Sequence, residues 1–327
     1  CRHQSRPMSA VWDWQPREPG RIEQPVALLR VDGAGTRRFL HGQTTAAIET
    51  AAAGAWISSC CTSPTARMRA LIEVLLDQDG AWVVIHGIEP AQADSIRQAL
   101  DRVLFPADQV RLSPLQPGWL STPVGPAPAP WPSSPSGQWL RLEEGSSWLL
   151  GNQVLRLANA PMPSWLVACP ALATSDRERW RLQQGIPAAP GELNDDTNPF
   201  ELGLADRVSL NKGCYLGQET LAKLATYDGV KQQLRRWCAA TPLAAGTRLV
   251  GPDGSKAGLI TSSLELDDGS GIGLALIRRP ALDQATLLAE ESNPAEETNP
   301  AVANPALEAT LSLPERFSAP PGSSVRA

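Results

Sequence analysis

The sequence lacks the cysteine and histidine patterns that bind metals. Its 327 residues include six cysteines and three histidines, and no C-x-x-C pair occurs among them. Cys60 and Cys61 are adjacent, which is poor geometry for chelating one ion. The cysteines also lack the paired spacings of a short disulfide framework. We therefore expect no stably bound metal or cluster, and reduced thiols such as a cytoplasmic protein has.

Long apolar runs and an excess of basic residues are absent as well. No apolar run approaches the ~20 residues that cross a bilayer, so we expect no membrane span. No signal-peptide pattern opens the chain, and Met8 is a more natural start than Cys1, so residues 1–7 are expected to be an upstream extension. The net charge of −5 argues against a broad nucleic-acid surface.

One basic cluster stands out against this acidic background. Its members lie within two dozen residues of one another and are Lys223, Lys231, Arg235 and Arg236. All four lysines of the chain fall in the same part of the sequence, between Lys212 and Lys256. The cluster is either a solvated face or the lining of a pocket for an anionic ligand.

The first third of the chain has the pattern of an α+β unit. Residues 26–31 predict a strand and residues 35–47 a helix. Residues 71–76 and 81–86 are apolar runs joined by an Asp-Gly turn, which indicates a hairpin. Apolar residues at three- and four-residue steps predict a helix over 90–104, and residues 110–112 a closing strand. This order is typical of an α+β unit and not of a parallel βαβ array.

A proline-rich stretch, residues 121–137, predicts an extended linker between two halves. Beyond it we expect strands at 139–142 and 148–150. A helix should follow at 175–184, with Ser175 and Glu178 as a capping box and Gly185 at its end.

The last third predicts a small antiparallel barrel over residues 237–317. Its short strands are expected at 248–250, 257–262, 271–277 and 307–317. Residues 289–306 repeat Asn-Pro-Ala three times in an acidic setting, which predicts a disordered insertion. Residues 318–327 are expected to be a frayed tail.

The most informative stretch is the octet Lys212-Gly213-Cys214-Tyr215-Leu216-Gly217-Gln218-Glu219. Its glycines permit unusual backbone on both sides of Cys214. Lys212 and the start of a helix predicted from Gln218 both favour a thiolate, so Cys214 is a candidate reactive cysteine. A glycine-rich turn with an incidental cysteine is the alternative.

The octet resembles the signature K-G-C-[FY]-x-G-Q-E of the YgfZ-type folate-binding proteins, which are relatives of the glycine-cleavage T-protein, an aminomethyltransferase. Further blocks resemble the family in the expected order: residues 31–45, 181–187, 198–204, 258–262 and 273–278. The resemblance covers about residues 26 to 280.

The resemblance implies an α+β, T-protein-like fold. Two α+β domains would form a central folate pocket, and the barrel would be the third part. The first domain would be split, with residues 8–48 joining 138–236, and residues 49–120 would be inserted as the second.

The resemblance also implies that the chain binds tetrahydrofolate or a derivative. The residues assigned to cofactor binding are Arg181, Glu201, Tyr215, Gln218, Glu219 and Lys223. Arg181 matches the position of the family's folate-contacting arginine. Tyr215 could stack on the pterin or pack against neighbouring side chains. Glu201 could accept a hydrogen bond from the pterin or be an ordinary loop carboxylate. Glu219 could accept such a bond or be a carboxylate that interacts with the helix dipole. Lys223 replaces the arginine of many members, so charge is kept but bidentate geometry is lost.

The implied function is folate-dependent support of iron–sulfur cluster assembly or repair and, through it, of tRNA modification. Iron–sulfur proteins or cluster-assembly factors would be the partners, with Cys214 and Lys212 as the catalytic centre. The T-protein's essential aspartate would fall at Arg69 or Ala70, so the acid is missing. An aminomethyltransferase or other one-carbon transferase is an alternative function, and the missing aspartate argues against it. A non-catalytic interaction module is the other alternative.

Overall fold

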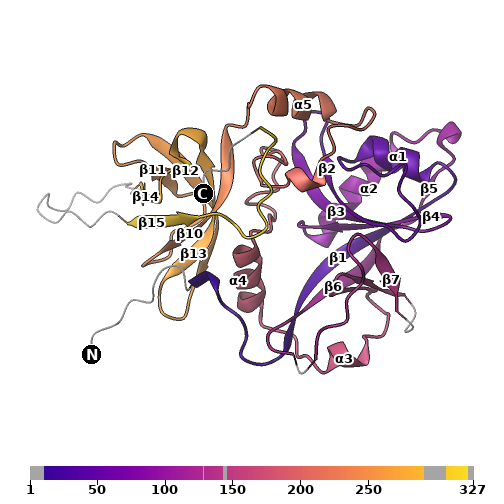
Figure 1. Cartoon of the computed structure of the whole chain (residues 1–327), viewed down its shortest axis with the longest axis horizontal. Coiled ribbons are helices and arrows are strands. Elements are labelled where there is room, and N and C mark those ends of the chain that lie inside the picture. The colour runs from indigo at the N-terminus through magenta and orange to yellow at the C-terminus, as the bar shows by residue number, and fades with distance from the viewer. Residues whose placement is uncertain (1–10, 128, 143–145, 291–306, 323–327) are drawn as a thin grey trace, which may run out of the picture.

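The computed structural model describes residues 11–127, 129–142, 146–290 and 307–322. It contains one large antiparallel sheet and a closed barrel, with helices between and outside them (Figure 1). The large sheet has nine strands in the order β2-β3-β4-β1-β6-β9-β8-β7, and β5 pairs with β1 at the side of this path. Its strands are β1 (Gly20–Asp32), β2 (Trp56–Thr62), β3 (Met68–Leu76), β4 (Gly80–His86), β5 (Arg111–Leu112), β6 (Gln116–Val124), β7 (Trp139–Arg141), β8 (Ser147–Leu150) and β9 (Gln153–Leu157).

Strand β1 joins the two halves of this sheet. Its C-terminal part pairs with β4, and its N-terminal part pairs with β6 from Gly20 to Leu28. The two regions expected to be separate α+β domains therefore share one continuous sheet. The expected α+β class with a C-terminal barrel is confirmed.

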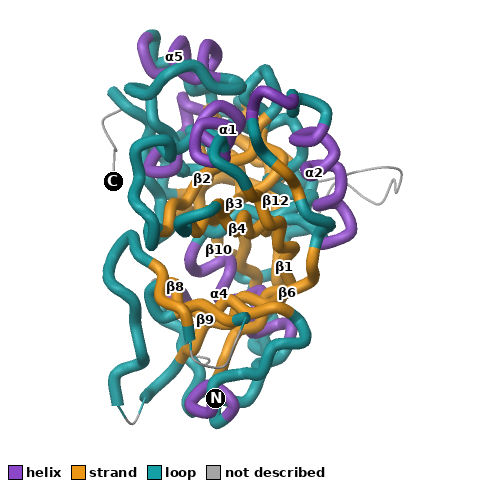
Figure 2. The backbone as a smooth tube through the Cα atoms, turned by 90° about the vertical axis from the view of Figure 1, so that its right-hand side faces the viewer, coloured by secondary structure: helices purple, strands orange, loops and turns teal. Residues whose placement is uncertain are grey.

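Two helices cover one face of the β2–β4 part of the sheet (Figure 2). They are α1 (Thr36–Gln43) and α2 (Ala93–Asp101), the second preceded by a 3₁₀ turn at Pro90–Gln92. Phe39 and Leu40 of α1 and Ile96 and Leu100 of α2 pack in one core with alternate residues of β1, β3 and β4. Burying these apolar faces is what fixes the helices to the sheet.

The barrel faces the other side of the sheet across helix α4 (Figure 1). Its closed strand order is β10-β13-β12-β11-β14-β15. The strands are β10 (Gln232–Ala239), β11 (Arg248–Val250), β12 (Lys256–Glu265), β13 (Gly271–Arg278), β14 (Thr286–Ala289) and β15 (Glu308–Ser312). The remaining helices are α3 (Ser164–Val167), α4 (Thr174–Gln184) and α5 (Gln218–Thr226), and single 3₁₀ turns lie at Pro106–Asp108, Ala205–Arg207 and Arg279–Ala281.

One core cluster ties the sheet, α4 and the barrel together. It contains Met68 and Leu71 of β3, Leu182 of α4, and Leu274 of β13. Trp12, near the start of the described chain, packs in the same cluster. The two bodies are therefore held against each other by apolar burial, and the space between them is where cavities form.

Several local predictions are corrected. Strand β6 continues to Val124, four residues into the expected linker, because the chain beyond Ser121 pairs with β1 alone and Pro123 is tolerated on such an edge. Helix α4 begins at Thr174 with Ala173 as N-cap, so the capping box at Ser175 does not form. The barrel begins at Gln232, and β14 reaches Ala289, the first residue of the expected insertion.

Of the remaining expectations, one is confirmed, and others concern residues outside the described ranges or stay untested. Gly185 ends α4 in a left-handed conformation, as predicted. The 291–306 part of the expected insertion and residues 1–7 lie outside the described residues. Within the described ranges, no helix has the length and apolar content to cross a membrane. The division into domains stays a prediction.

Candidate functional site

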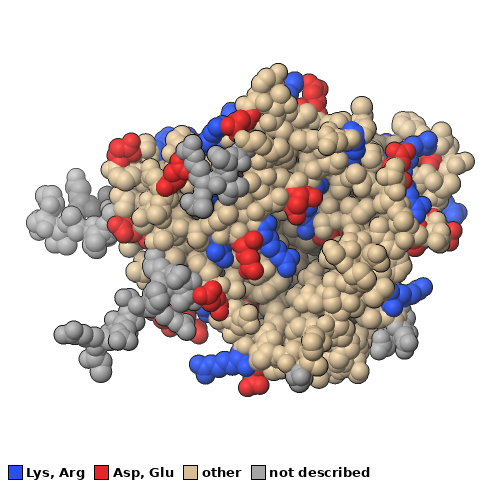
Figure 3. All heavy atoms as spheres, viewed as in Figure 1, with Lys and Arg blue, Asp and Glu red and all other residues tan. Residues whose placement is uncertain are grey.

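A cavity of about 600 Å³ lies between the sheet, α4 and the barrel. Figure 3 shows this face of the molecule hollowed near its middle, with acidic and basic side chains at the rim. Four segments supply most of the wall: β1 at residues 22–25, α4 at 177–181, the loop at 186–191, and β12 at 259–263. Its volume is that of a site for a drug-sized ligand.

Flat and aliphatic side chains supply the apolar part of this wall. Trp180 comes from α4, Ile22 from β1, and Ile88 from the segment after β4. Pro187 adds a rigid apolar ring just past the end of α4. An aromatic ring system could lie against these surfaces.

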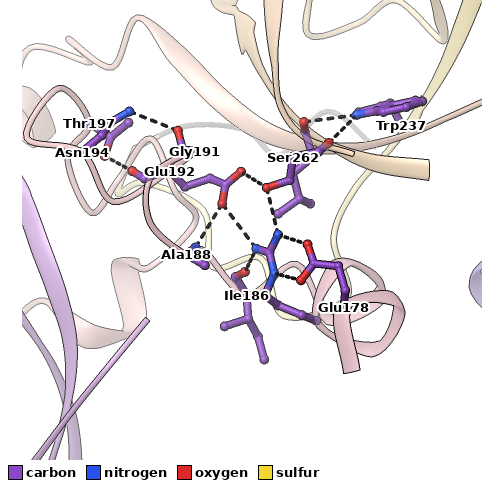
Figure 4. Close-up of polar contacts among 11 residues, drawn as sticks. Glu178, Ile186, Ala188, Gly191, Glu192, Asn194, Thr197, Trp237 and Ser262 are labelled. Atoms are coloured by element: carbon purple, nitrogen blue, oxygen red, sulfur yellow. Dashed lines mark hydrogen bonds and ion pairs between the residues drawn. The ribbon is translucent and has the colours of Figure 1, made fainter. Parts of the chain in front are cut away.

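Figure 4 shows a polar network that joins Glu178, Glu192 and Ser262. Arg181 is its centre, because it donates hydrogen bonds to all three. Its Nε and Nη2 donate to the two oxygens of Glu178 at 2.8 and 2.6 Å. Nη1 donates to the Ile186 carbonyl at 2.7 Å and to Glu192 Oε2 at 3.3 Å, and Nη2 also donates to Ser262 Oγ at 2.8 Å. All five N–H groups of Arg181 are thus used within the chain.

Glu192 makes this network a link between α4 and the barrel. The residue is fully buried, and its Oε1 accepts from Ser262 Oγ of β12 at 2.7 Å. Burial lowers the pKa of Arg181, but the bonds to Glu178 and the charge of Glu192 outweigh it, so the pKa rises above the ordinary value. Arg181 remains charged and holds two carboxylates in place.

Arg177 lies one turn before Arg181 on α4, and it differs from Arg181 in having few partners within the chain. It lines the wall, and its one hydrogen bond runs from Nη1 to the Glu23 carbonyl at 3.4 Å. Within the described part of the chain, no carboxylate pairs with it. Gln24, the next residue of β1, also lines the cavity, and its side-chain amide has no hydrogen-bond partner among the described residues. These two side chains offer N–H donors to an incoming acceptor.

A smaller cavity of about 210 Å³ adjoins the first and shares Gln24 and Trp180 with it. Glu73 of β3 is a buried carboxylate in its wall. Its Oε1 accepts from Arg207 at 2.9 Å and lies 3.2 Å from His86 Nε2, and its Oε2 accepts from Trp56 Nε1 and Ser58 Oγ at 2.8 and 2.6 Å. Both carboxylate oxygens are therefore fully engaged.

These partners keep Glu73 ionised. Burial raises the pKa of a carboxyl group, but here Arg207 and the hydrogen bonds from His86 and Ser58 outweigh it and hold the pKa at about 2. Arg207 is half-buried and stays charged, because the charge of Glu73 raises its pKa. A carboxylate this well satisfied is not a poised general base at neutral pH.

The octet lies away from both cavities, because none of its residues is among their lining. Lys212 Nζ donates to the carbonyls of His41, Thr44 and Ala46 at 2.5, 2.6 and 2.7 Å, at the C-terminal end of α1. It also lies 4.3 Å from the centre of the Tyr215 ring. Burial lowers the pKa of Lys212 to about 7, whereas only the ammonium form has the three N–H donors that three carbonyls require. We take the ammonium as the bonded form.

Cys214 is exposed, while the other cysteines of the described chain, Cys60, Cys61, Cys169 and Cys238, are buried. Tyr215 is buried under Lys212 and packs with Phe200 and Leu221, so it packs and does not stack in a cavity. Gln218 donates from its amide to the Lys212 carbonyl at 3.3 Å. The octet therefore forms a braced loop that presents one thiol to solvent.

The other predicted residues are also apart from the cavities. Glu219 and Lys223 form an exposed i,i+4 pair on α5 at 2.6 Å. Glu201 is buried and accepts from the Asn198 amide at 3.1 Å, and burial raises the pKa of its carboxyl. Of the eight residues predicted for the site, Arg181 alone lines one of these two cavities. Their functional roles stay predictions.

The predicted basic cluster does not converge on one pocket. Arg235 lies 5.3 Å from the Phe317 ring centre, and Arg236 lies 4.6 Å from that of Trp12. Arg236 also donates to the Gln183 carbonyl at 3.0 Å. Neighbouring residues of a strand point to opposite sides, so these two guanidinium groups serve different contacts.

The sequence analysis did not single out Arg177, Trp180, Glu192 or Ser262. A weak signal existed, since Arg177, Trp180 and Arg181 recur at three- and four-residue steps on one predicted helix. The sequence gave no such signal for Glu192 and Ser262, because these two residues meet only when the barrel packs against the loop that follows α4. At the position of the missing aspartate, Arg69 pairs with Asp195 at 3.4 Å and Ala70 is buried in the core beneath α1 and α2.

No model of a protein family matches the chain. A chloroplastic candidate transferase of Arabidopsis thaliana is 31% identical over 282 residues, which cover 77% of this chain and 63% of that protein. The tRNA-modifying protein YgfZ of Aliivibrio fischeri is 32% identical over 113 residues, or 31% of this chain and 35% of that protein. The same-named protein of Sodalis glossinidius is 38% identical over 71 residues, or 20% and 21%. The chain thus spans less than two thirds of these relatives' lengths.

Among solved structures, the glycine cleavage system aminomethyltransferase T of Bartonella henselae superposes with a TM-score of 0.72. The match covers 95% of this chain and 90% of that one at 13% sequence identity. At this identity the similarity concerns the fold alone.

Proposed function

We propose, since this chain is a YgfZ-type, T-protein-like protein, that it binds a reduced folate in the larger cavity and supports iron–sulfur proteins as an accessory factor. The observation that carries the ligand part is the cavity of about 600 Å³ itself. It combines the apolar surface of Trp180 with a cation, Arg177, that has no acidic partner in the described chain. A folate needs such surfaces, because it has a flat ring system and a carboxylate tail.

Titration calorimetry with tetrahydrofolate tests this ligand. We expect micromolar binding and a rise in melting temperature that grows with ligand concentration, since the ligand binds the folded state. Trp180→Ala should weaken binding about tenfold or more by removing an aromatic wall. Trp131→Ala is the matched control, because this tryptophan does not line the cavity. Absence of heat and of any thermal shift at millimolar tetrahydrofolate would contradict the ligand assignment.

The accessory role is supported by the exposed thiol of the octet. Cys214 is accessible on a loop braced by Lys212, whereas burial raises the pKa of Cys60 to about 12 and of Cys61 to about 11. A thiolate in an accessible loop can transiently accept a cluster, a sulfur or a one-carbon unit. A cytoplasmic location is part of this proposal, although the plant relative is named chloroplastic.

Replacement of the thiol tests the accessory role in cells. Cys214→Ser should leave folding and folate binding intact, because the side chain is exposed and lines neither cavity. It should abolish restoration of iron–sulfur enzyme activity in cells that lack their own YgfZ-type protein. Cys238→Ser, which changes a buried thiol, is the control. Full activity with Cys214→Ser would leave the octet a structural turn and favour the interaction-module alternative.

A further inference from the structure

We propose that Arg177, together with Gln24, binds the carboxylate of the ligand in the larger cavity, and that Arg181 does not bind this carboxylate. This inference rests on the proposed function, because it takes the ligand to be a reduced folate or another ring compound with a carboxylate tail.

The charge around Arg181 is unfavourable for a carboxylate. One guanidinium lies between two carboxylates, those of Glu178 and Glu192, so this cluster has a net charge of −1. Its five N–H groups are already used. A ligand carboxylate placed here would have to displace a bonded oxygen and would meet repulsion from the remaining anion.

Arg177 has the opposite properties. It lines the same cavity, it is half-buried, and its one contact is the long bond to the Glu23 carbonyl. A carboxylate can bind it without breaking an ion pair of the protein. Guanidinium groups bind carboxylates through two parallel N–H···O bonds, and such charge-assisted bonds are the stronger ones. Partial burial reduces screening by solvent and strengthens the pair further.

Gln24 supplies a second donor in the same place. It follows Glu23 on β1, and alternation along the strand places its side chain in the cavity while Glu23 turns away to pair with Arg21 and Arg156. Its amide has no partner within the described residues. Arg177 contacts the backbone of the residue before Gln24, so the two donors belong to neighbouring parts of the cavity wall.

The experiment compares two ligands on three variants. Tetrahydrofolate has the carboxylate tail, and a tetrahydropterin without a carboxylate lacks it. Arg177→Met should weaken tetrahydrofolate about tenfold or more and leave the tetrahydropterin unchanged. It should also remove most of the salt dependence of tetrahydrofolate binding, since the lost contact is an ion pair. Arg177→Lys should restore part of the affinity, because it keeps the charge but not the bidentate geometry.

Arg179→Met is the matched control on the same helix. Arg179 lies 5.3 Å from the Trp14 ring centre and does not line the cavity, so both ligands should bind this variant as they bind the wild type. If Arg177→Met binds tetrahydrofolate as the wild type does, the inference is wrong while the folate assignment stands. Equal weakening of both ligands would also overturn it, as general damage to the cavity. If the wild type binds neither ligand, the proposed function fails and the inference fails with it.

Discussion

Two half-buried guanidinium groups on the cavity walls hold carboxylates. Arg181 pairs with Glu178 and Glu192, and Arg207 pairs with Glu73. Removing one member of a buried pair leaves a charge without compensation, which costs more than the pair itself contributes. The first effect of changing these residues should therefore be on stability.

Arg181→Ala should destabilise the protein strongly. The fully buried Glu192 carboxylate would lose its cation, and breaking such a pair costs about 3–5 kcal/mol. Urea denaturation measures the loss as a lower midpoint. The control is Arg177→Met, whose side chain makes one long hydrogen bond and should change stability by less than about 1 kcal/mol. A wild-type midpoint for Arg181→Ala would show that Glu192 finds another partner.

Glu73 should make the protein labile in acid. Its pKa is about 2 in the folded protein against an ordinary 4.5. A carboxyl group with a lowered folded pKa stabilises the protein above its unfolded pKa, and this contribution is lost as the pH falls through the folded value. About 3 kcal/mol should disappear between about pH 4.5 and pH 2.

Stability curves between pH 2 and pH 7 check the Glu73 prediction. Glu73→Gln should be less stable at neutral pH and should show a shallower decline in acid. Glu219→Gln, which changes an exposed carboxylate, should follow the wild-type curve. Parallel curves for Glu73→Gln and the wild type would assign the acid sensitivity to other groups.

At the scale of elements, Lys212 joins the octet loop to the end of α1. The carbonyls that it bonds belong to residues 168 and 166 positions away in the sequence, Thr44 and Ala46, and to His41. His41 lies in the last turn of α1, and Thr44 and Ala46 follow it. The end of a helix leaves backbone carbonyls without partners, and Lys212 supplies them. The octet is thus a brace for a distant helix end as well as the loop that presents Cys214.

Lys212→Met should loosen both the end of α1 and the octet loop. Three buried or half-buried carbonyls would lose their donor, at a cost of about 1–3 kcal/mol. Hydrogen exchange should accelerate in residues 40–46 and 212–217. Lys223→Met, which breaks an exposed pair on α5, is the matched control and should leave exchange in these segments unchanged. Unchanged exchange in Lys212→Met would mean that water replaces the ammonium fully.

Local pattern predicted the barrel strands β11, β12, β13 and β15 and the hairpin of β3 and β4, since these depend on apolar alternation and turn residues close in sequence. It did not predict β10 and β14. It predicted α1 to reach residue 47, although α1 ends at Gln43, because Thr44 is extended and its carbonyl bonds Lys212. The octet was recognised from the sequence, but its position outside the two cavities was not predicted. Which side chains meet across the sheet–barrel interface depends on docking, so Glu192 with Ser262 could not be predicted.

For the whole molecule, the decisive feature is a T-protein-like fold in which the two positions predicted for the T-protein's acid carry no carboxylate. The two positions that could supply it are an exposed, paired Arg69 and a core residue, Ala70, and Glu73 is locked by four partners. Glu73, the acidic residue that follows these positions on β3, is thus not free to help ionise a folate nitrogen.

The purified protein should therefore not produce methylene-tetrahydrofolate from an aminomethylated carrier protein. A coupled assay with a bona fide aminomethyltransferase as positive control measures this. Ala70→Asp serves as a second comparison, since this site is buried and should not gain activity. Turnover by the wild-type protein would favour the enzyme over the accessory factor.

The core that joins sheet and barrel also sets the order in which the chain can mature on the ribosome. Trp12 precedes Leu274 and Leu276, which belong to the same core cluster, by more than two hundred residues and is therefore synthesised well before them. Until then, Trp12 and the barrel-facing side of β3 stay uncovered, a state in which a nascent chain is open to association with chaperones. The larger cavity, whose last wall is β12, is therefore complete only after the barrel strands have been synthesised.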